Sequence, residues 1–275
     1  MYLNPGVPTI ASYQQLTEDP VFTRMEKHAQ AFTEKNRSVL QKYQKHWILD
    51  PFHQWSRQWE YPFVFQELED YLHTHASKEI RILDAGSGVT FFPDFITTHH
   101  CQTFVECCDT NTAYPEMFQQ IYPNHPRVRF QIEDLRCLSY PAQSFDLIYC
   151  ISVLEHTHQY PLILHEFKRL LKRGGRLILT FDISLTETAD IPVREAERLL
   201  LMLGELLTPF AESEPLNDTL KQPVVSTPAV HKTAPKLLPW KHPFLSHLKS
   251  ALKRRRWPKG PYKNLTFYCG TFVKD

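Results

Sequence analysis

EIRILDAGSGVT, from Glu79 to Thr90, is the stretch that decides the fold we expect for this chain. Its apolar run, Ile80 to Leu83, predicts a short buried strand with Asp84 at the carboxyl end. Gly86 and Gly88 follow, and they let the backbone approach a ligand because no side chain intervenes. The stretch therefore predicts a nucleotide-cofactor site at the end of a strand.

The spacing of the glycines narrows the kind of cofactor. Dinucleotide-binding turns have the pattern GxGxxG, in which a pyrophosphate rests on the N-terminus of the next helix. Here the third glycine is missing, and the bulky residues Phe91, Phe92 and Pro93 follow Thr90. This favours a cofactor without a pyrophosphate.

The same stretch resembles the first motif of the class I methyltransferases that bind S-adenosylmethionine (SAM), in which an acidic residue precedes GxG. The resemblance, which is to the small-molecule, methyltransferase type 11-like members, implies that SAM is the cofactor. It also implies that Asp84 faces the methionine amino group or a water near it. The residues expected to contact the cofactor in this turn are Asp84, Ala85, Gly86, Ser87 and Gly88.

Two later signals arrive in the order that this family shows. Asp109 ends a second apolar strand about twenty residues beyond the glycine turn, where such folds hold the ribose hydroxyls. The segment from Ile132 to His156 resembles the family's adenine-edge motif, fourth strand and following loop. By this resemblance the Asp134 carboxylate accepts from the adenine amine and the Leu135 amide donates to the ring. The remaining cofactor candidates are Thr110 and Ile151.

These acidic residues also have a simpler interpretation. Asp109 and Asp134 could cap the turns or helices that follow them, and Thr110 and Asn111 could cap the next helix.

The rest of the core follows from periodicity. Tyr160 to Arg173 predicts an amphipathic helix that Gly174 and Gly175 stop, and Arg176 to Phe181 predicts a fifth strand. The resemblance covers Glu79 to Asp182. We therefore expect an α/β, Rossmann-like, doubly wound and mostly parallel seven-stranded sheet with an antiparallel last strand.

Four segments make up the chain in this interpretation. Residues 1–62 form a helical and aromatic N-terminal cap, and residues 63–208 form the SAM-binding core. Residues 209–262 contain nine prolines, which limit regular structure, so we expect them to form an insertion or lid over the site. Residues 263–275 supply the closing antiparallel edge strand. Outside the core motifs, helices are expected within 17–46, 63–73 and 193–207.

An aromatic cluster before the first strand suggests where an acceptor binds. Its members either fix an N-terminal helix to the core or form the walls of an apolar pocket, in which Arg57 could also orient the substrate. His156 follows the fourth strand, where the family presents the transferable methyl group, so it is either the catalytic base or a packing residue. The substrate-binding candidates are His53, Trp55, Trp59, Tyr61 and His156.

Composition limits the class of protein and its partners. The net charge of +1, from 31 basic and 30 acidic residues, gives no global attraction to nucleic acid or membrane. The six cysteines show no metal-ligand spacing, so we expect no metal, and a reducing cytoplasm is the simplest compartment. No secretory leader or membrane-spanning run is expected, and the oligomeric state is open.

The sequence therefore predicts a methyltransferase that uses SAM to methylate an oxygen, nitrogen or carbon atom of a small or medium organic acceptor by in-line displacement. The loop after the fourth strand lacks the NPPY and Pro-Cys motifs of DNA-base and glutamine methyltransferases. Two alternatives stay open. One is an RNA or protein methyltransferase that uses the basic cluster at 253–257. The other is a SAM-binding regulatory or scaffold protein without transferase activity.

Overall fold

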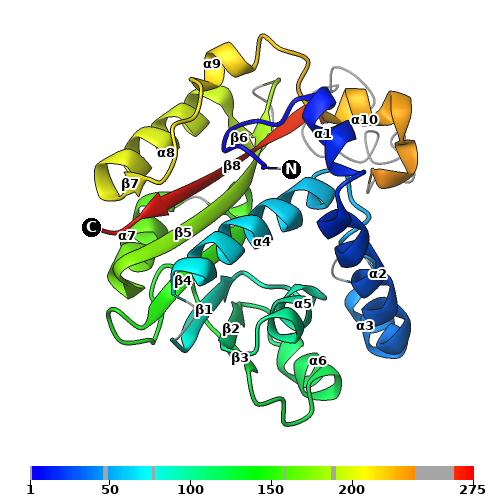
Figure 1. The fold of residues 1–275 in the computed structure, drawn as a ribbon, viewed down its shortest axis with the longest axis vertical. Helices are drawn as coiled ribbons and strands as arrows, with labels where there is room; N and C mark the ends of the chain where they lie inside the picture. Colours follow the sequence, from blue (N-terminus) through cyan, green and yellow to red (C-terminus); the bar gives the residue numbers. More distant parts are fainter. Residues whose placement is uncertain (1, 46–48, 76–77, 158, 187–189, 239–262) are drawn as a thin grey trace, which may run out of the picture.

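A mixed β-sheet with helices on both faces organises the chain (Figure 1). The computed structural model describes residues 2–45, 49–75, 78–157, 159–186, 190–238 and 263–275. The strands are β1 (Ile80–Ala85), β2 (Thr103–Asp109), β3 (Val128–Ile132), β4 (Phe145–Ile151), β5 (Leu171–Ser184), β6 (Ile191–Pro192), β7 (Thr208–Pro209) and β8 (Leu265–Val273). The longer helices are α2 (Pro20–Lys35), α4 (Arg57–Thr74), α5 (Phe92–His99), α6 (Tyr114–Ile121), α7 (Tyr160–Leu170) and α8 (Val193–Leu206). Shorter helical segments are α1 (Ile10–Leu16), α3 (Arg37–Tyr43), η1 (Leu154–His156), α9 (Leu216–Thr219), α10 (Thr227–Thr233) and η2 (Pro235–Leu237).

The strand order is β3-β2-β1-β4-β5-β8-β7, and β6 pairs with the end of β5. The five strands β1 to β5 run parallel to one another, whereas β8 is antiparallel to both of its neighbours, β5 and β7. The predicted doubly wound, mostly parallel sheet with an antiparallel last strand is confirmed. Because β1, β2 and β4 are parallel, the residues that follow their carboxyl ends lie at one edge of the sheet.

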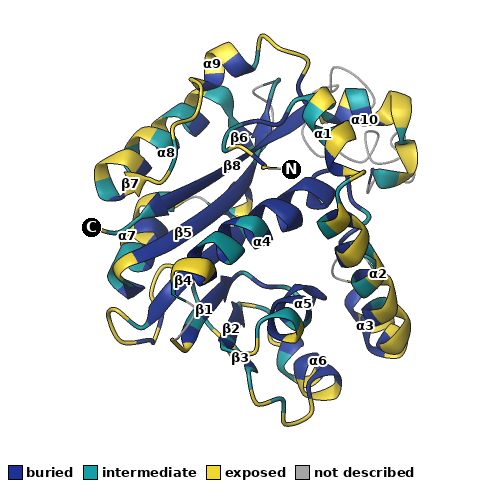
Figure 2. Cartoon of the chain, viewed as in Figure 1, coloured by how far each residue is buried: buried dark blue, intermediate teal, exposed yellow. Residues whose placement is uncertain are grey.

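Burial on both faces explains why the central strands read as continuous apolar runs. Ile82 and Val105 pack in the cluster that contains α2, α4, α5 and α6, whereas Leu83 and Cys108 pack in the cluster that contains α7 and α8. Figure 2 shows these strands as buried along most of their length. Such a core fixes the strand tips in place.

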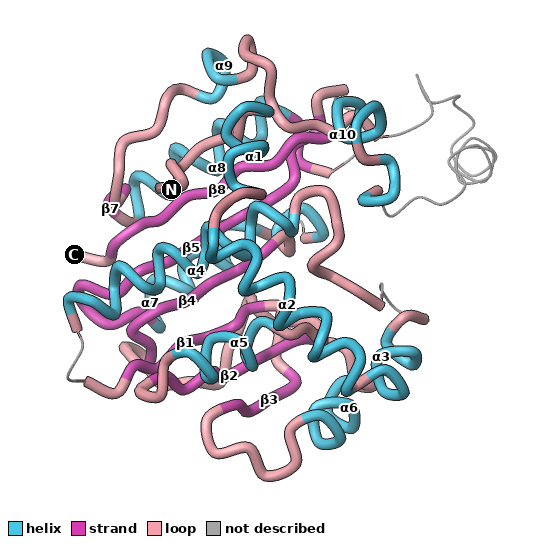
Figure 3. The backbone as a smooth tube through the Cα atoms, turned by 45° about the vertical axis from the view of Figure 1, so that its right-hand side comes forward, coloured by secondary structure: helices cyan, strands magenta, loops and turns pink. Residues whose placement is uncertain are grey.

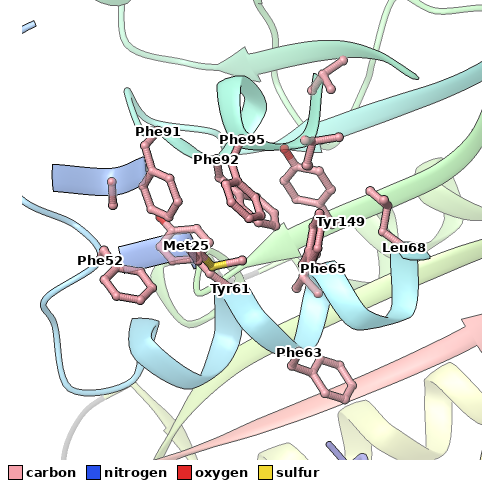
Figure 4. Close-up of a cluster of buried hydrophobic side chains, with 14 of the residues drawn as sticks. Met25, Phe52, Tyr61, Phe63, Phe65, Leu68, Phe91, Phe92, Phe95 and Tyr149 are labelled. Carbon is pink, nitrogen blue, oxygen red and sulfur yellow. The ribbon is translucent and has the colours of Figure 1, made fainter. Parts of the chain in front are cut away.

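The N-terminal helices join the face that α4 and α5 cover. Asp19 caps α2 by accepting from the Val21 amide at 2.8 Å, and Pro20 occupies the first helical turn, where its missing N–H costs little. Met25 of this helix lies near Phe52, Tyr61 and Phe91 in a shared aromatic cluster (Figure 4). Helix α3 continues alongside α6 (Figure 3). The helices expected within 17–46 are thus α2 and α3, and they pack on the core.

Several boundaries differ from the sequence expectation. Helix α7 ends at Leu170 rather than Arg173, because Leu171 adopts an extended conformation and pairs with Phe145, so β5 begins before Gly174. Strand β5 therefore has 14 residues. Helix α4 begins at Arg57 and contains Pro62, so it crosses the 62/63 position where cap and core were divided.

The last strand is also less isolated than expected. The two-residue strand β7 pairs with the end of β8, and Gly6 bridges to Cys269 from the other end of the chain. Strand β8 is therefore not a free edge. Among the described residues, no helix combines the length and apolarity that crossing a membrane requires.

The described part of the expected lid, residues 209–238, packs beside the N-terminus. The Val225 amide donates to the Pro8 carbonyl at 2.9 Å, and α10 contacts β8. The basic cluster at 253–257 lies outside the described residues.

Candidate cofactor and acceptor site

A cavity of about 710 Å³ opens at the carboxyl ends of β1, β2 and β4. Its volume lies within the range typical of sites for small molecules and cofactors, about 300–1,000 Å³. Among the ten cofactor candidates, those that line it are Asp84, Gly86, Ser87, Gly88, Asp109, Thr110, Asp134, Leu135 and Ile151. Ala85 does not line the cavity, because its side chain packs in the cluster on the α7 and α8 side of the sheet.

The glycine turn has the geometry that its sequence requires. Gly86 and Gly88 have φ angles of 75° and 54°, a left-handed region that favours glycine. The amides of Gly86 and Ser87 both donate to the Cys108 carbonyl at 2.9 Å, which ties the turn to the end of β2. A Cβ atom on Gly88 would stand 2.5 Å from the Tyr43 hydroxyl, so a side chain there would require the Tyr43 ring to move.

Asp84 is buried at the floor of the turn. Burial raises the pKa of its carboxyl to about 8, and the nearby Asp109 adds to this, while the Tyr149 hydroxyl acts in the opposite direction. A buried carboxyl without a cationic partner among the described residues suits a ligand that brings an ammonium group.

Asp109 caps the turns beside it and also lines the cavity, so the capping interpretation does not exclude contact with a ligand. One carboxylate oxygen accepts from the Gly88 amide at 3.2 Å, and the other accepts from the Asn111 amide at 3.1 Å. The Asn111 side chain in turn accepts from the Ala113 amide before α6. Asp109 thus holds the turns around it while its carboxylate still lines the cavity.

Asp134 is held by a neighbour. Its carboxylate accepts from the backbone amide of Arg136 at 2.9 Å and from the guanidinium of the same residue. These hydrogen bonds lower the pKa of Asp134 to about 2. Leu135 beside it is buried and contributes an apolar wall.

Residues 83–179 match the family model described as "Methyltransferase domain". Residues 83–179 are thus a methyltransferase domain, as the resemblance predicted, and the family that they match uses SAM as its cofactor.

A curated relative of this methyltransferase is a tRNA N(3)-cytidine methyltransferase, METTL2, from Gallus gallus. The two are 27% identical over 129 residues, which is 42% of this chain and 33% of the relative. The match thus spans about a third of the relative's length.

Solved structures show the same fold. One is a protein of Galdieria sulphuraria provisionally described as a sarcosine dimethylglycine methyltransferase, with a TM-score of 0.53, 14% identity, and coverage of 78% of this chain and 85% of that one. Another is geranyl diphosphate C-methyltransferase from Streptomyces coelicolor A3(2), solved with Mg²⁺, geranyl diphosphate and S-adenosylhomocysteine, with a TM-score of 0.51, 12% identity, and coverage of 77% and 79%. A third is the [4+2]-cyclase SpnF, with a TM-score of 0.50, 15% identity, and coverage of 76% and 80%. At these identities the similarity establishes the fold alone.

The acceptor candidates of the methyltransferase separate into two groups. Tyr61 and His156 line the cavity, whereas His53, Trp55 and Trp59 do not. Trp55 packs edge-on against Phe267 at 5.3 Å, and its amide donates to the Leu237 carbonyl at 3.0 Å. These two tryptophans are buried, so they fix the N-terminal segment to the core.

The tyrosine at the end of α3 was not among the sequence candidates. Tyr43 lines the cavity, and its ring lies 5.5 Å from that of Tyr114, edge to face. The signal in the sequence was its position four residues after Val39, which continues the apolar face of the N-terminal helices. The N-terminal segment thereby contributes to the cavity wall beside Gly88.

A buried polar network was also missed. Glu60 accepts from Arg57, from Ser152 at 2.6 Å and from Thr180 at 2.7 Å, so one carboxylate joins α4 to the ends of β4 and β5. Its side chain has no exposed surface. The i, i+3 spacing of Arg57 and Glu60 was visible in the sequence, but their burial was not.

His156, the last residue of η1, lines the cavity. Desolvation lowers its pKa, and this effect exceeds that of the nearby Asp190. The imidazole is therefore neutral at neutral pH and able to accept a proton. Among the described residues, no group of His, Cys, Asp and Glu side chains is arranged to hold a metal ion.

His53 has a structural role that pH should reveal. Its ring nitrogens contact Asp50 at 2.6 Å and Glu26 at 3.0 Å, and the hydrogen bond to Asp50 is the main reason that its pKa rises from 6.5 to about 9. Because the folded pKa exceeds the unfolded one, the stabilisation is complete below pH 6.5 and is lost as pH rises through 9. We expect His53→Gln to lower the free energy of unfolding at pH 6 by about 1.5–3 kcal/mol. At pH 9.5 the difference in the free energy of unfolding between His53→Gln and wild type, measured by urea unfolding, should be smaller than at pH 6.

The exposed His73 near the end of α4 supplies the control for this experiment. His73→Gln should leave the free energy of unfolding unchanged at both pH values. A His53→Gln deficit that is the same at pH 6 and pH 9.5 would contradict the ion-pair interpretation.

Proposed function

We propose that this chain transfers the methyl group of SAM to a small or medium organic acceptor by in-line displacement. The observation that supports the proposal is a single cavity whose lining includes cofactor candidates, such as Asp109 and Leu135, together with Tyr61, Ser152 and His156. No residue of the described part of the proline-rich segment, 209–238, lines it.

The main requirement of methyl transfer is that the protein aligns the acceptor with the methyl carbon of SAM. Bound SAM supplies a methyl group on a sulfonium, whose carbon–sulfur bond breaks as the acceptor's lone pair forms the new bond. Holding the acceptor in line behind that carbon can contribute about 7–11 kcal/mol. Tyr61 and Ser152 would orient the acceptor, and the neutral His156 imidazole would take the proton that a hydroxyl or activated carbon loses.

Release of S-adenosylhomocysteine (SAH) tests the proposal directly. We would incubate the full chain with SAM and panels of small amines, carboxylic acids, phenols and bulk tRNA. Stoichiometric SAH release with one of the small molecules is the expected result. Binding of SAM without release on any panel would favour a SAM-binding protein without transferase activity.

The tRNA arm is included because of the similarity to the chicken tRNA enzyme. Methylation of tRNA, with no small molecule accepted, would favour an RNA methyltransferase.

Asp109→Ala should weaken cofactor binding. The variant loses the carboxylate expected at the ribose and the partner of the Gly88 amide. Hydrogen bonds to charged groups contribute about 1.5–3 kcal/mol, so we expect an increase of about 10- to 100-fold in the SAH dissociation constant by calorimetry.

Asp218→Ala is the matched control, since Asp218 is an exposed partner of Lys221 away from the cavity. Equal SAH affinities for Asp109→Ala and wild type would reject the cofactor role of Asp109.

His156→Ala separates a base from a packing residue. For an acceptor that must lose a proton, we expect kcat to fall by about 10²- to 10⁴-fold. In the wild type, kcat should decline only as pH drops below 6.5, because the pKa of His156 is lowered. This acid limb should disappear from the pH profile of the variant, and full turnover in the variant would leave His156 without a catalytic role.

A further inference from the structure

The outward face of α8 carries the most exposed large apolar side chain among the described residues. Leu201 lies in the middle of this helix and is 69% exposed. On the opposite side of the helix, Leu199 and Leu203 are buried against the sheet. Figure 2 shows α8 at the outside of the molecule, with exposed residues along its outer side. A single exposed leucine is ordinary, so the residues around it decide whether this face binds a partner.

A glycine lies one turn beyond Leu201 on the same face. Gly204 is exposed and lies within the helix, where glycine is less stable than alanine. The described residues give no reason for it, because its φ is not in the left-handed region and a Cβ there would meet no atom within 4 Å. A close approach from outside the protomer would be such a reason.

Two opposite charges flank Leu201 along the helix. Arg198 lies one turn before it and Glu205 one turn after it. At about 100° per residue, both lie on one side of Leu201, and Gly204 lies on the other. The Arg198 side chain is 76% exposed and forms a long ion pair of 3.5 Å with Glu195 of the same helix. Glu205 is exposed and forms no ion pair with the described part of the chain.

This arrangement makes the face complementary to itself. A two-fold axis through Leu201 pairs two antiparallel copies of α8, so that residues at equal distances before and after Leu201 lie opposite each other. Arg198 lies about 4.5 Å before Leu201 along the helix axis, and Glu205 lies about 6 Å after it. Each arginine therefore meets the glutamate of the second copy, and Gly204 leaves space for the longer Glu197. A parallel pair would place like charges opposite each other instead.

We propose that α8 is the interface of a homodimer, in which two copies of the chain pack antiparallel about Leu201 and form two ion pairs between Arg198 and Glu205. The 14 residues of α8 give a face about 21 Å long and about 10 Å wide, which is small beside the roughly 800 Å² that each partner buries in a standard interface. The dimer is therefore weak and dissociates on dilution. No residue of α8 lines the cavity, so the proposal goes beyond the proposed function and does not depend on it.

Sedimentation velocity of the full chain at about 1–100 µM tests for the dimer, since small interfaces give weak complexes. Wild type should show a reversible equilibrium between monomer and dimer. Leu201→Lys should raise the dissociation constant at least about tenfold, because two like charges then meet at the two-fold axis. Ile132→Lys is the matched control, at a 49% exposed residue of the edge strand β3, at the other end of the sheet from β8 and β7. It should keep the wild-type constant.

Exchange of the two charges tests the antiparallel arrangement. Arg198→Glu and Glu205→Arg should each weaken the dimer by about five- to thirtyfold, because two attractive pairs become repulsive. An equimolar mixture of the two variants re-forms both pairs in a heterodimer, so it should recover most of the wild-type affinity. Lower helix stability alone could not give recovery on mixing. The proposal is overturned by a wild type that stays monomeric at about 100 µM, by a dimer that Leu201→Lys leaves intact, or by no recovery in the mixture. Dissociation by Ile132→Lys alone would place the interface at the β3 edge instead.

Discussion

Gly86→Ala will abolish measurable SAH binding. Gly86 has a φ of 75°, and a Cβ there would stand 2.6 and 2.9 Å from the two γ-carbons of Val153. Left-handed strain costs about 1–3 kcal/mol, and overpacking costs about 1–3 kcal/mol more. Because Val153 is β-branched and follows Ser152, itself at a φ of 48°, the glycine turn must move instead. Titration calorimetry should show a loss of at least about 100-fold in affinity.

Gly174→Ala is a close control for backbone strain. Gly174 has a φ of 73°, nearly that of Gly86, but a Cβ there meets no atom within 4 Å. This variant should lose some stability and bind SAH as wild type does. Gly86→Ala/Val153→Ala removes the clash and should recover part of the affinity. Equal SAH affinities for Gly86→Ala and Gly174→Ala would contradict the steric argument.

The part of the cavity around the glycine turn could be predicted from the sequence because its residues are close together in the chain. A strand, an acid and a glycine turn lie within 79–90, and strand tips of a parallel sheet meet at one edge. This logic placed Asp84, Gly88 and Asp109 together, and the structure has all three lining one cavity. The exception, Ala85, alternates to the opposite face of the sheet, as the period of a strand requires.

The part of the cavity lined by Arg57, Tyr61 and His156 was harder to predict because its residues come from distant segments. Trp55 and Trp59 had the composition of a pocket, but the path of the chain buries them in the core instead. Arg57 lies between them in the sequence and reaches the cavity, because α4 begins there rather than at Phe63. The helix was expected from residue 63, yet α4 runs through Pro62 with one backbone donor fewer. Only tertiary packing determines which of these neighbouring side chains reaches the cavity and which is buried in the core.

Glu60→Ala will be among the most destabilising substitutions in this protein. The Glu60 side chain has no exposed surface and accepts from Arg57, Ser152 and Thr180. Its removal leaves the Arg57 guanidinium buried without a direct carboxylate partner. Breaking a buried ion pair in this way costs about 3–5 kcal/mol. Urea unfolding should show a lower midpoint with an unchanged slope.

The energetic coupling within the pair distinguishes this network from an ordinary loss of packing. Replacing both partners, as in Arg57→Met/Glu60→Leu, removes the charges together, so the double variant should be more stable than Glu60→Ala alone. Glu34→Ala breaks an exposed ion pair with the same i, i+3 spacing, that of Arg37 with Glu34, and should leave the midpoint unchanged. If Glu60→Ala and Glu34→Ala unfold at the same urea concentration, Glu60 does not stabilise the junction of α4 with β4 and β5. If the double variant is no more stable than Glu60→Ala, the loss comes from packing rather than from an unpaired charge, because removal of Arg57 would then relieve nothing.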